Sequence, residues 1–110
     1  MNWSAIYNQA VSAGKKAAHE YNAKLPPEAQ RGLDCGFVWV TVHPAHGPFI
    51  AWCRANGKGD KGYRGDWQFW YYEFDDTNTQ SIDVHTAAAR AFAFALAEHG
   101  IRADIGSRMD

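Results

Sequence analysis

The sequence has few of the residues that build most protein cores: Leu, Ile, Val and Phe together make up 19 of the 110 residues. Such a low content is typical of disordered chains only when the net charge is high and aromatic residues are few. The formal net charge here is −1, and Phe, Trp and Tyr make up 15% of the chain. We therefore predict a folded globular domain in which aromatic side chains and alanines replace the missing aliphatic ones.

An excess of basic residues is also missing, with 11 Lys and Arg against 12 Asp and Glu. A protein that binds duplex nucleic acid through its phosphates needs such an excess, so we exclude that class. No segment approaches the roughly 18 apolar residues of a membrane span. Residues 1–10 lack the basic start and apolar run of a secretory signal. We therefore expect a cytoplasmic protein that does not bind membranes.

Cysteine is rare as well, since Cys35 and Cys53 are the two in the chain and do not form a CxxC pair. In a reducing cytosol they are expected to be reduced and to act as small buried hydrophobic side chains. His43 and His46 have H-x-x-H spacing and precede Cys53, but a convincing fourth zinc ligand is lacking. We therefore expect no metal ion and no cofactor.

The first 24 residues favour a long helix over residues 4–24, with Ser4 as its N-cap. Apolar and small residues recur at helical spacing, with aromatics at both ends: Trp3, Tyr7, Ala10, Gly14, Ala17 and Tyr21. The small residues in the middle would let this helix lie close against a neighbour. Pro26 and Pro27 stop it, and residues 25–35 form a polar linker.

The remaining chain alternates between strand and helix patterns. A strand over 36–43 is followed by a helix over 48–56, which Pro48 begins and Gly57 ends. A glycine-rich loop at 57–65 leads to a second strand at 66–74. A helix capped by Thr79 or Ser81 and ended by Gly100 precedes a short strand at 101–105 and a tail at 107–110.

These patterns predict an α+β fold of a single domain, residues 1–110, with an α+β core at 36–106. The element order α-β-α-β-α-β gives a small α/β sandwich: a three-stranded sheet with helices mainly on one face. In the first strand Val38, Val40 and Val42 would face the helices, and Phe37 and Trp39 the other side.

The aromatic strand faces are the strongest candidate binding feature. Trp39 from the first strand, together with one aromatic row of the second, which includes Trp67, would form a platform on which nucleobases can stack. The alternative is that the N-terminal helix, or a second copy in a dimer, covers the same side chains.

Basic residues near this platform are candidates for binding an anion. Lys61 and Arg64 flank Tyr63 in the glycine-rich loop, and Arg108 lies near the chain end. The loop lacks the GxxxxGK[ST] pattern of a phosphate-binding P-loop. The alternative interpretation is that Lys61 and Arg64 only keep a mobile loop soluble, while Arg108 pairs with Asp104 or Asp110.

Catalytic patterns are weak. No Ser-His-Asp order, nucleophile elbow or HExxH is present. The alternative function is a small enzyme that uses His43 and His46, or the acidic turn with Asp75 and Asp76, which we otherwise interpret as a solvated turn.

A resemblance adds to this picture. The segment Cys35-Gly36-Phe37-Val38-Trp39-Val40, the Gly-Tyr-Arg-Gly turn before an aromatic strand, and the terminal Ser-Arg-Met-Asp occur in this order. In these features the chain is similar to a family of small bacteriophage and prophage proteins of unknown function. The resemblance implies an intracellular accessory protein of phage origin, located in the host cell and active in host interaction or counter-defence.

The resulting hypothesis is a non-enzymatic binding protein that acts as an inhibitor. It would either block a host protein through exposed aromatic anchors or sequester a small nucleotide. We expect it to form a homo-oligomer, most simply a symmetric dimer.

Overall fold

The computed structural model describes residues 1–27 and 35–109. Its four strands form one antiparallel sheet in the order β2-β3-β1-β4, which confirms the α+β class. In chain order the elements are α1 (Trp3–Lys24), β1 (Gly36–Val42), α3 (Pro48–Asn56), β2 (Asp60–Lys61), β3 (Trp67–Trp70), the 3-10 turn η1 (Tyr71–Glu73), α4 (Ile82–Ala97) and β4 (Ala103–Met109).

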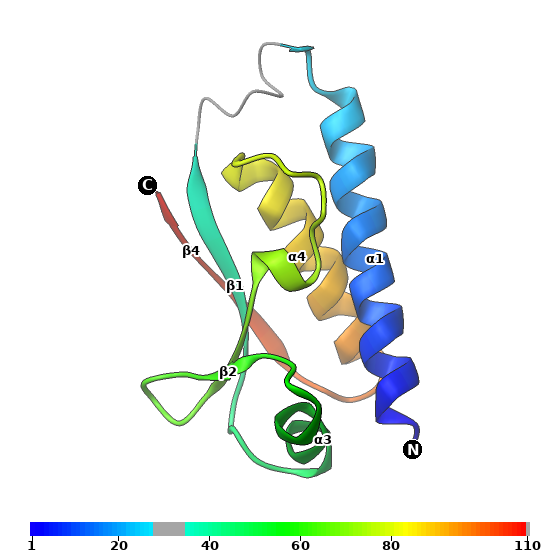
Figure 1. Cartoon of the computed structure of the whole chain (residues 1–110), viewed down its shortest axis with the longest axis vertical. Helices are drawn as coiled ribbons and strands as arrows, with labels where there is room; N and C mark the ends of the chain where they lie inside the picture. Colours follow the sequence, from blue (N-terminus) through cyan, green and yellow to red (C-terminus); the bar gives the residue numbers. More distant parts are fainter. Residues whose placement is uncertain (28–34, 110) are drawn as a thin grey trace.

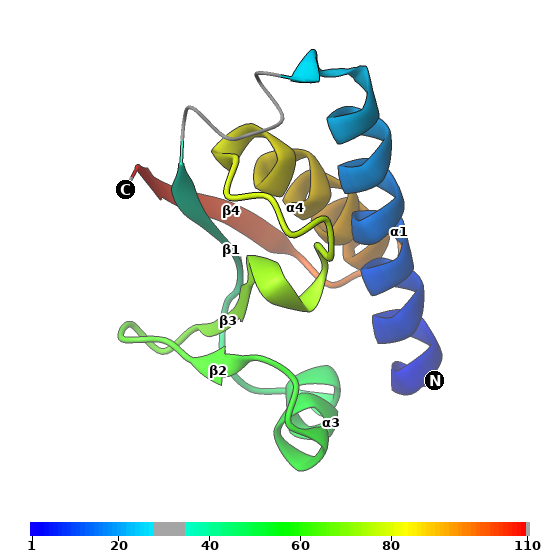
Figure 2. The same cartoon turned by 45° about the horizontal axis from the view of Figure 1, so that its top comes forward.

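The helices lie on one side of the sheet. In Figures 1 and 2, β1 and β4 lie on the left, α4 lies beside them, and α1 lies beyond α4. Helix α3 packs at the lower end, where the Trp3 and Phe49 rings approach to 5.8 Å and Phe49 also contacts Phe69 of β3. Helices α1 and α3 thus pack together and against the sheet.

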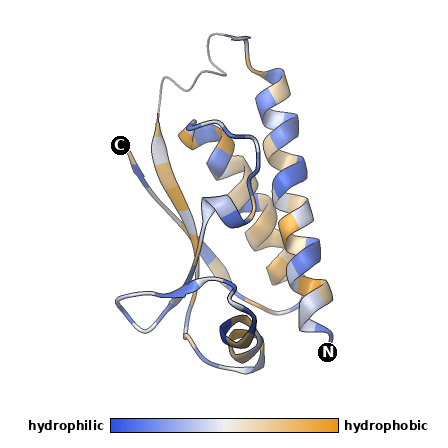
Figure 3. Cartoon of the chain, in the orientation of Figure 1, coloured by the Kyte–Doolittle hydropathy of each residue, from blue (hydrophilic) through white to orange (hydrophobic). Residues whose placement is uncertain are grey.

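The core lies between the sheet and these helices. Strand β1 alternates as predicted, with Val38, Val40 and Val42 buried and the residues between them partly exposed. Hydrophobic colours in Figure 3 gather on β1 and along α4, whereas α1 is mixed. Phe69 and Phe92 complete this core with ring centroids 5.3 Å apart, so one sheet face is packed against helices.

Helix α1 approaches its neighbours closely at Gly14. A Cβ atom there would lie 2.7 Å from the Phe74 carbonyl oxygen and 3.2 Å from that of Ala88, as the small middle of the helix predicted. Two details differ from expectation. Asn2 rather than Ser4 is the N-cap, accepting from the Ala5 amide at 3.0 Å. Tyr21 is 39% exposed and does not anchor the core.

The other helix ends follow their sequence signals. Helix α3 has Pro48 in its first turn and ends at Gly57, which adopts a φ of 68°. Helix α4 is capped by Ser81, whose hydroxyl accepts from the Val84 amide at 3.4 Å. These boundaries confirm the predicted helices, except that α4 ends at Ala97 rather than at Gly100.

The prediction of three strands was wrong, because the sheet has four. Asp60 and Lys61, placed in the loop 57–65, form β2 and pair with β3. Strand β3 ends at Trp70 rather than at residue 74, since the Tyr71 carbonyl accepts the amides of Phe74 and Asp75 and closes a tight turn.

The predicted tail also differs. The strand predicted at 101–105 begins at Ala103, and residues 107–109 continue it. The full length of β4 pairs with β1, from Val42 opposite Ala103 to Gly36 opposite Met109. Asp110 and residues 28–34 of the predicted linker lie outside the described residues. No helix in the described part of the chain is both long and apolar enough to cross a membrane.

Candidate functional site

The sheet face opposite the helices carries a cavity of about 420 Å³, which we call the aromatic cavity. Strands β1, β3 and β4 and the turn η1 supply its lining. The lining residues are Phe37, Trp39, Trp70, Tyr71, Tyr72 and Arg108. Five of these six side chains are aromatic, so the cavity suits a planar ligand.

Two tryptophans form the floor of the cavity. Trp39 and Trp70 are directly opposite in the β1–β3 pair, with ring centroids 5.2 Å apart and planes tilted by 46°. On the other side of β1, Trp39 is opposite Gly106 of β4. A Cβ atom at Gly106 would come within 2.5 Å of the Trp39 indole, so the missing side chain leaves the space that this ring occupies.

Arg108 supplies the positive charge of the cavity. It is opposite Phe37 in the β1–β4 pair, and its guanidinium carbon lies 5.6 Å from the centre of the Phe37 ring. Within residues 1–27 and 35–109 two basic side chains lie within ion-pair distance of a carboxylate, His19 beside Asp76 and His85 beside Asp75. Arg108 therefore does not pair with Asp104. A guanidinium on an aromatic face can still pair two oxygens of a phosphate or carboxylate.

Trp67 does not belong to this cavity. Its side chain is 4% exposed and lies on the buried face of β3. Its indole Nε1 donates to the Lys58 carbonyl at 2.9 Å, and the Arg54 guanidinium lies 4.7 Å above the ring. The structure therefore places this candidate in the core, and Trp70 takes its expected place beside Trp39.

The basic loop lies away from Arg108. Lys61 is in β2, and two strands separate β2 from β4 in the sheet order. Tyr63 and Arg64 follow in the exposed loop, which projects away from α1 and α4 in both views. Of the predicted ligand-binding residues, the structure brings together Trp39 and Arg108, and not Lys61, Tyr63 or Arg64.

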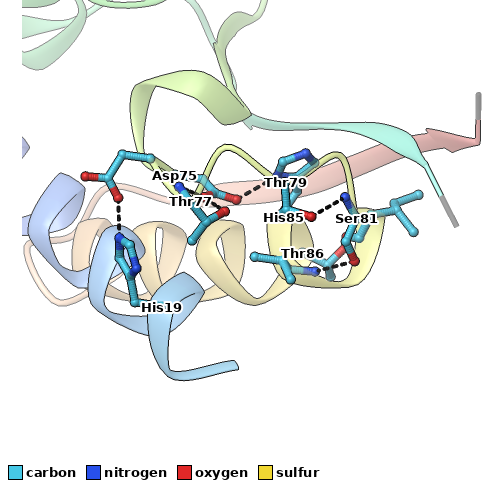
Figure 4. Close-up of polar contacts among 10 residues, drawn as sticks. His19, Asp75, Thr77, Thr79, Ser81, His85 and Thr86 are labelled. Atoms are coloured by element: carbon cyan, nitrogen blue, oxygen red, sulfur yellow. Dashed lines mark hydrogen bonds and ion pairs between the residues drawn. The ribbon is translucent and has the colours of Figure 1, made fainter. Parts of the chain in front are cut away.

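A buried Asp–His pair lies beside the aromatic cavity. His85 of α4 is 2% exposed, and its Nδ1 is 2.6 Å from Asp75 Oδ2 (Figure 4). The Thr77 amide and hydroxyl donate to Asp75 Oδ1 at 2.9 and 2.7 Å. Burial alone would raise the pKa of Asp75, but the hydrogen bonds from His85 and Thr77 outweigh it and hold that pKa below its ordinary value.

His85 lines a second, smaller cavity of about 180 Å³, which we call the histidine pocket. Tyr71 stacks on the imidazole with centroids 3.9 Å apart. The imidazole Nε2 is buried and has no hydrogen-bond partner among the described residues. The pocket lining is Cys35, Gly36, Phe37, Tyr71, Gln80 and His85. Phe37 and Tyr71 line both cavities, so the two are adjacent.

A third polar group lies at Glu73. Its Oε1 accepts from the Tyr7 hydroxyl at 2.8 Å and from the Gly59 amide at 3.1 Å. Burial raises the pKa of Glu73, although the two hydrogen bonds act in the opposite direction and lower it. Burial, and then the charge of Glu73, raise the pKa of the nearby Cys53 thiol to about 12. Cys53 is thus an inert core residue, as predicted, whereas Cys35 is only partly buried.

The acidic turn is not uniformly solvated, which corrects our expectation for Asp75. Asp75 is buried against His85, whereas Asp76 is exposed and its Oδ1 lies 2.7 Å from His19 Nε2. His43 and His46 are exposed. In the part of the chain that the structure describes, no three His, Cys, Asp or Glu side chains are grouped to hold a metal ion.

The Asp75–His85 pair was missed at the sequence level, although a signal was present. His85 precedes Ala88 and Phe92 by three and seven residues, so it lies on the buried stripe of its helix. A histidine on such a stripe needs a polar partner. Comparisons of the chain with family models, curated proteins and solved structures gave no match.

Proposed function

We propose that the protein is a non-enzymatic binding protein that holds a nucleotide in the aromatic cavity. The observation that carries this proposal is the placement of Arg108 beside the Trp39–Trp70 pair, at one edge of a cavity of about 420 Å³. Stacking rings and a guanidinium are the two groups that recognise a base and a phosphate. Pockets that bind small ligands commonly have volumes of about 300 Å³ or more, so the volume of the aromatic cavity also fits a nucleotide.

The magnitudes support moderate binding. A base stacked on an aromatic side chain contributes roughly 1–3 kcal/mol. Hydrogen bonds from Arg108 to a phosphate contribute roughly 1.5–3 kcal/mol. Together these contributions amount to roughly 2.5–6 kcal/mol, which corresponds to dissociation constants between about 15 mM and about 40 μM. Contacts of the ligand with Tyr71 and Tyr72 would make the binding tighter.

The biological role follows from the resemblance to phage proteins and is part of the proposal. A phage protein that holds a nucleotide can sequester a signal that the host uses in its defence. The same exposed rings can anchor a host protein, since Trp, Tyr and Arg dominate protein interfaces. If no nucleotide binds, binding to a host protein is the function to test next.

We also propose that two copies associate through β4. This strand is the last in the sheet order, and its outer side pairs with no other strand among the described residues. Ile105 is 39% and Met109 is 58% exposed along it. An exposed edge strand of seven residues is a template for a second strand. A second copy that pairs there would extend the sheet across a two-fold axis.

Titration calorimetry with mono-, di- and cyclic nucleotides tests the ligand. We expect heat from at least one of them, and Arg108→Ala should weaken its binding about tenfold, more at low salt. Arg64→Ala is the matched control, because Arg64 is an exposed arginine outside the cavity lining. Equal losses in both variants, or no heat from any nucleotide at millimolar concentration, would contradict the proposal.

A further inference from the structure

We propose that His85 reads the edge of the bound base, accepting a hydrogen bond from an N–H donor of the ligand at its Nε2 atom. This inference rests on the proposed function, which it deepens by naming a class of base. Its starting point is the histidine pocket, which His85 lines and which shares lining residues with the aromatic cavity. The Nε2 atom of His85 is buried and has no hydrogen-bond partner among the described residues.

The partners of Asp75 fix which ring nitrogen carries the proton. A carboxylate only accepts hydrogen bonds, and Asp75 Oδ1 already accepts two from Thr77. The other oxygen, Oδ2, therefore accepts from Nδ1–H of His85 at 2.6 Å. In the neutral imidazole this leaves the lone pair on Nε2, so the pocket presents a hydrogen-bond acceptor.

The acceptor is rigidly held. The Tyr71 ring stacks on His85 at 3.9 Å with planes 25° apart, and the side chains of His85 and Asp75 are 2% and 1% exposed. A buried acceptor without a partner costs free energy, which a donor placed in the pocket would recover. An ordered water could fill that place, and the experiment below separates a water from a ligand.

The position of the pocket limits the ligand group. Phe37 and Tyr71 line both cavities, so a base that lies against them can direct its edge toward Nε2. Gln80 lines the same pocket, and its side-chain amide offers both a donor and an acceptor. This combination suits a base with an exocyclic amino group next to a ring nitrogen, as in adenine, which glutamine recognises in pairs of hydrogen bonds.

The test compares two ligands that differ in this amino group alone: adenosine 5′-monophosphate and purine riboside 5′-monophosphate. For the wild-type protein, calorimetry should give about tenfold tighter binding of the adenosine compound. Asp75→Asn should abolish this difference, because the new amide donates to Nδ1, moves the ring proton to Nε2 and turns the acceptor into a donor. Asp76→Asn, the same change at the exposed neighbour, should preserve it.

The outcomes are distinct. Equal affinity of the wild-type protein for both compounds overturns the role of His85 and leaves nucleotide binding intact, with a water as the occupant of the pocket. An unchanged preference in Asp75→Asn overturns it too. Nitrogen-15 spectra of the histidine rings provide a check without variants, and a proton on Nε2 in the ligand-free wild type contradicts the proposal. If neither compound binds, both the proposed adenine-class ligand and the proposed role of His85 are overturned. Binding of other nucleotides would still agree with the proposed function.

Discussion

The indole of Trp39 occupies the space above Gly106 on the neighbouring strand, where a Cβ atom would lie 2.5 Å from the Trp39 Nε1 and Cε2 atoms. An aromatic ring across from a strand glycine covers the exposed backbone and fixes its own orientation. The floor of the aromatic cavity therefore depends on a residue that has no side chain.

Gly106→Val should displace the Trp39 ring and reduce nucleotide binding, even though valine favours strands. Near-ultraviolet circular dichroism and tryptophan fluorescence report the ring environment. Ser107→Val is the control, because residue 107 pairs with Val38 and lies on the opposite face of β4. We expect Ser107→Val to leave both spectra and nucleotide binding unchanged. If the spectra of Gly106→Val equal those of the wild type, Gly106 does not determine the position of the Trp39 ring.

Trp39 and Trp67 should respond differently to replacement by alanine. Trp67 is 4% exposed and packed in the core, so Trp67→Ala should cost roughly 3–5 kcal/mol of stability. Trp39 is partly exposed, so Trp39→Ala should keep a cooperative thermal transition and lose ligand binding. Loss of the transition in Trp39→Ala would remove this residue from the candidate site.

Asp75 should contribute stability at neutral pH that is lost in acid. Hydrogen bonds lower its pKa in the folded state, so its contribution is present above the ordinary value of 3.8 and disappears as the pH falls through the folded pKa. In urea unfolding, Asp75→Asn should be less stable than the wild type at pH 7, and the gap should close below pH 3.8. Asp76→Asn should differ by less than about 1 kcal/mol throughout.

Glu73 should show the opposite dependence. Burial raises its pKa in the folded state, so the ionised form lowers stability above that pKa, and the penalty vanishes as the pH falls below the ordinary value of 4.5. Glu73→Gln keeps an oxygen to accept from Tyr7 and Gly59. It should therefore be more stable than the wild type at pH 7 and equal to it in acid. A less stable Glu73→Gln at pH 7 would show that the charge itself is required, and Glu20→Gln on the exposed side of α1 serves as the control.

Association through β4 should depend on its exposed apolar residues. Ile105→Lys introduces a charge on the edge strand, a common device against strand pairing. Light scattering should give twice the chain mass of 12.3 kDa for the wild type and a single chain for Ile105→Lys. Tyr63→Lys, at a fully exposed site in the loop, should remain dimeric. A monomeric wild type at high concentration contradicts the proposed dimer.

Much of the fold could be predicted because its signals are local. The Ser81 cap of α4, the stop at Gly57 and the alternation of β1 appear directly in the residues. The ends of β3 and β4 could not be predicted this way. Tyr71 and Tyr72 favour strands, yet the chain turns there because Glu73 and Asp75 find partners on other elements. Ser107 and Arg108 look like a tail, and pairing with β1 makes them a strand.

The candidate site was predictable in part for the same reason. Trp39 and Arg108 are conspicuous residue types, but whether Trp67 or Trp70 joins them depends on which face of β3 meets the helices, a question of tertiary packing. Asp75 and His85 are ten residues apart, and their contact depends on the turn at Tyr71 and on how α4 docks. Such relationships arise only when the whole chain is folded.

The register of β1 has a consequence for the order in which the sheet forms. Trp39 meets Trp70 across 31 residues of chain, but meets Gly106 across 67. Closing the longer loop costs about 0.6 kcal/mol more for each doubling of length, and long-range pairing slows folding. We expect β4 to join the sheet late and to exchange its amide hydrogens sooner than the central strands β1 and β3, since its outer edge pairs with no other described strand. Arg108 would then be carried by a labile edge strand, and a bound phosphate would slow the opening of that strand.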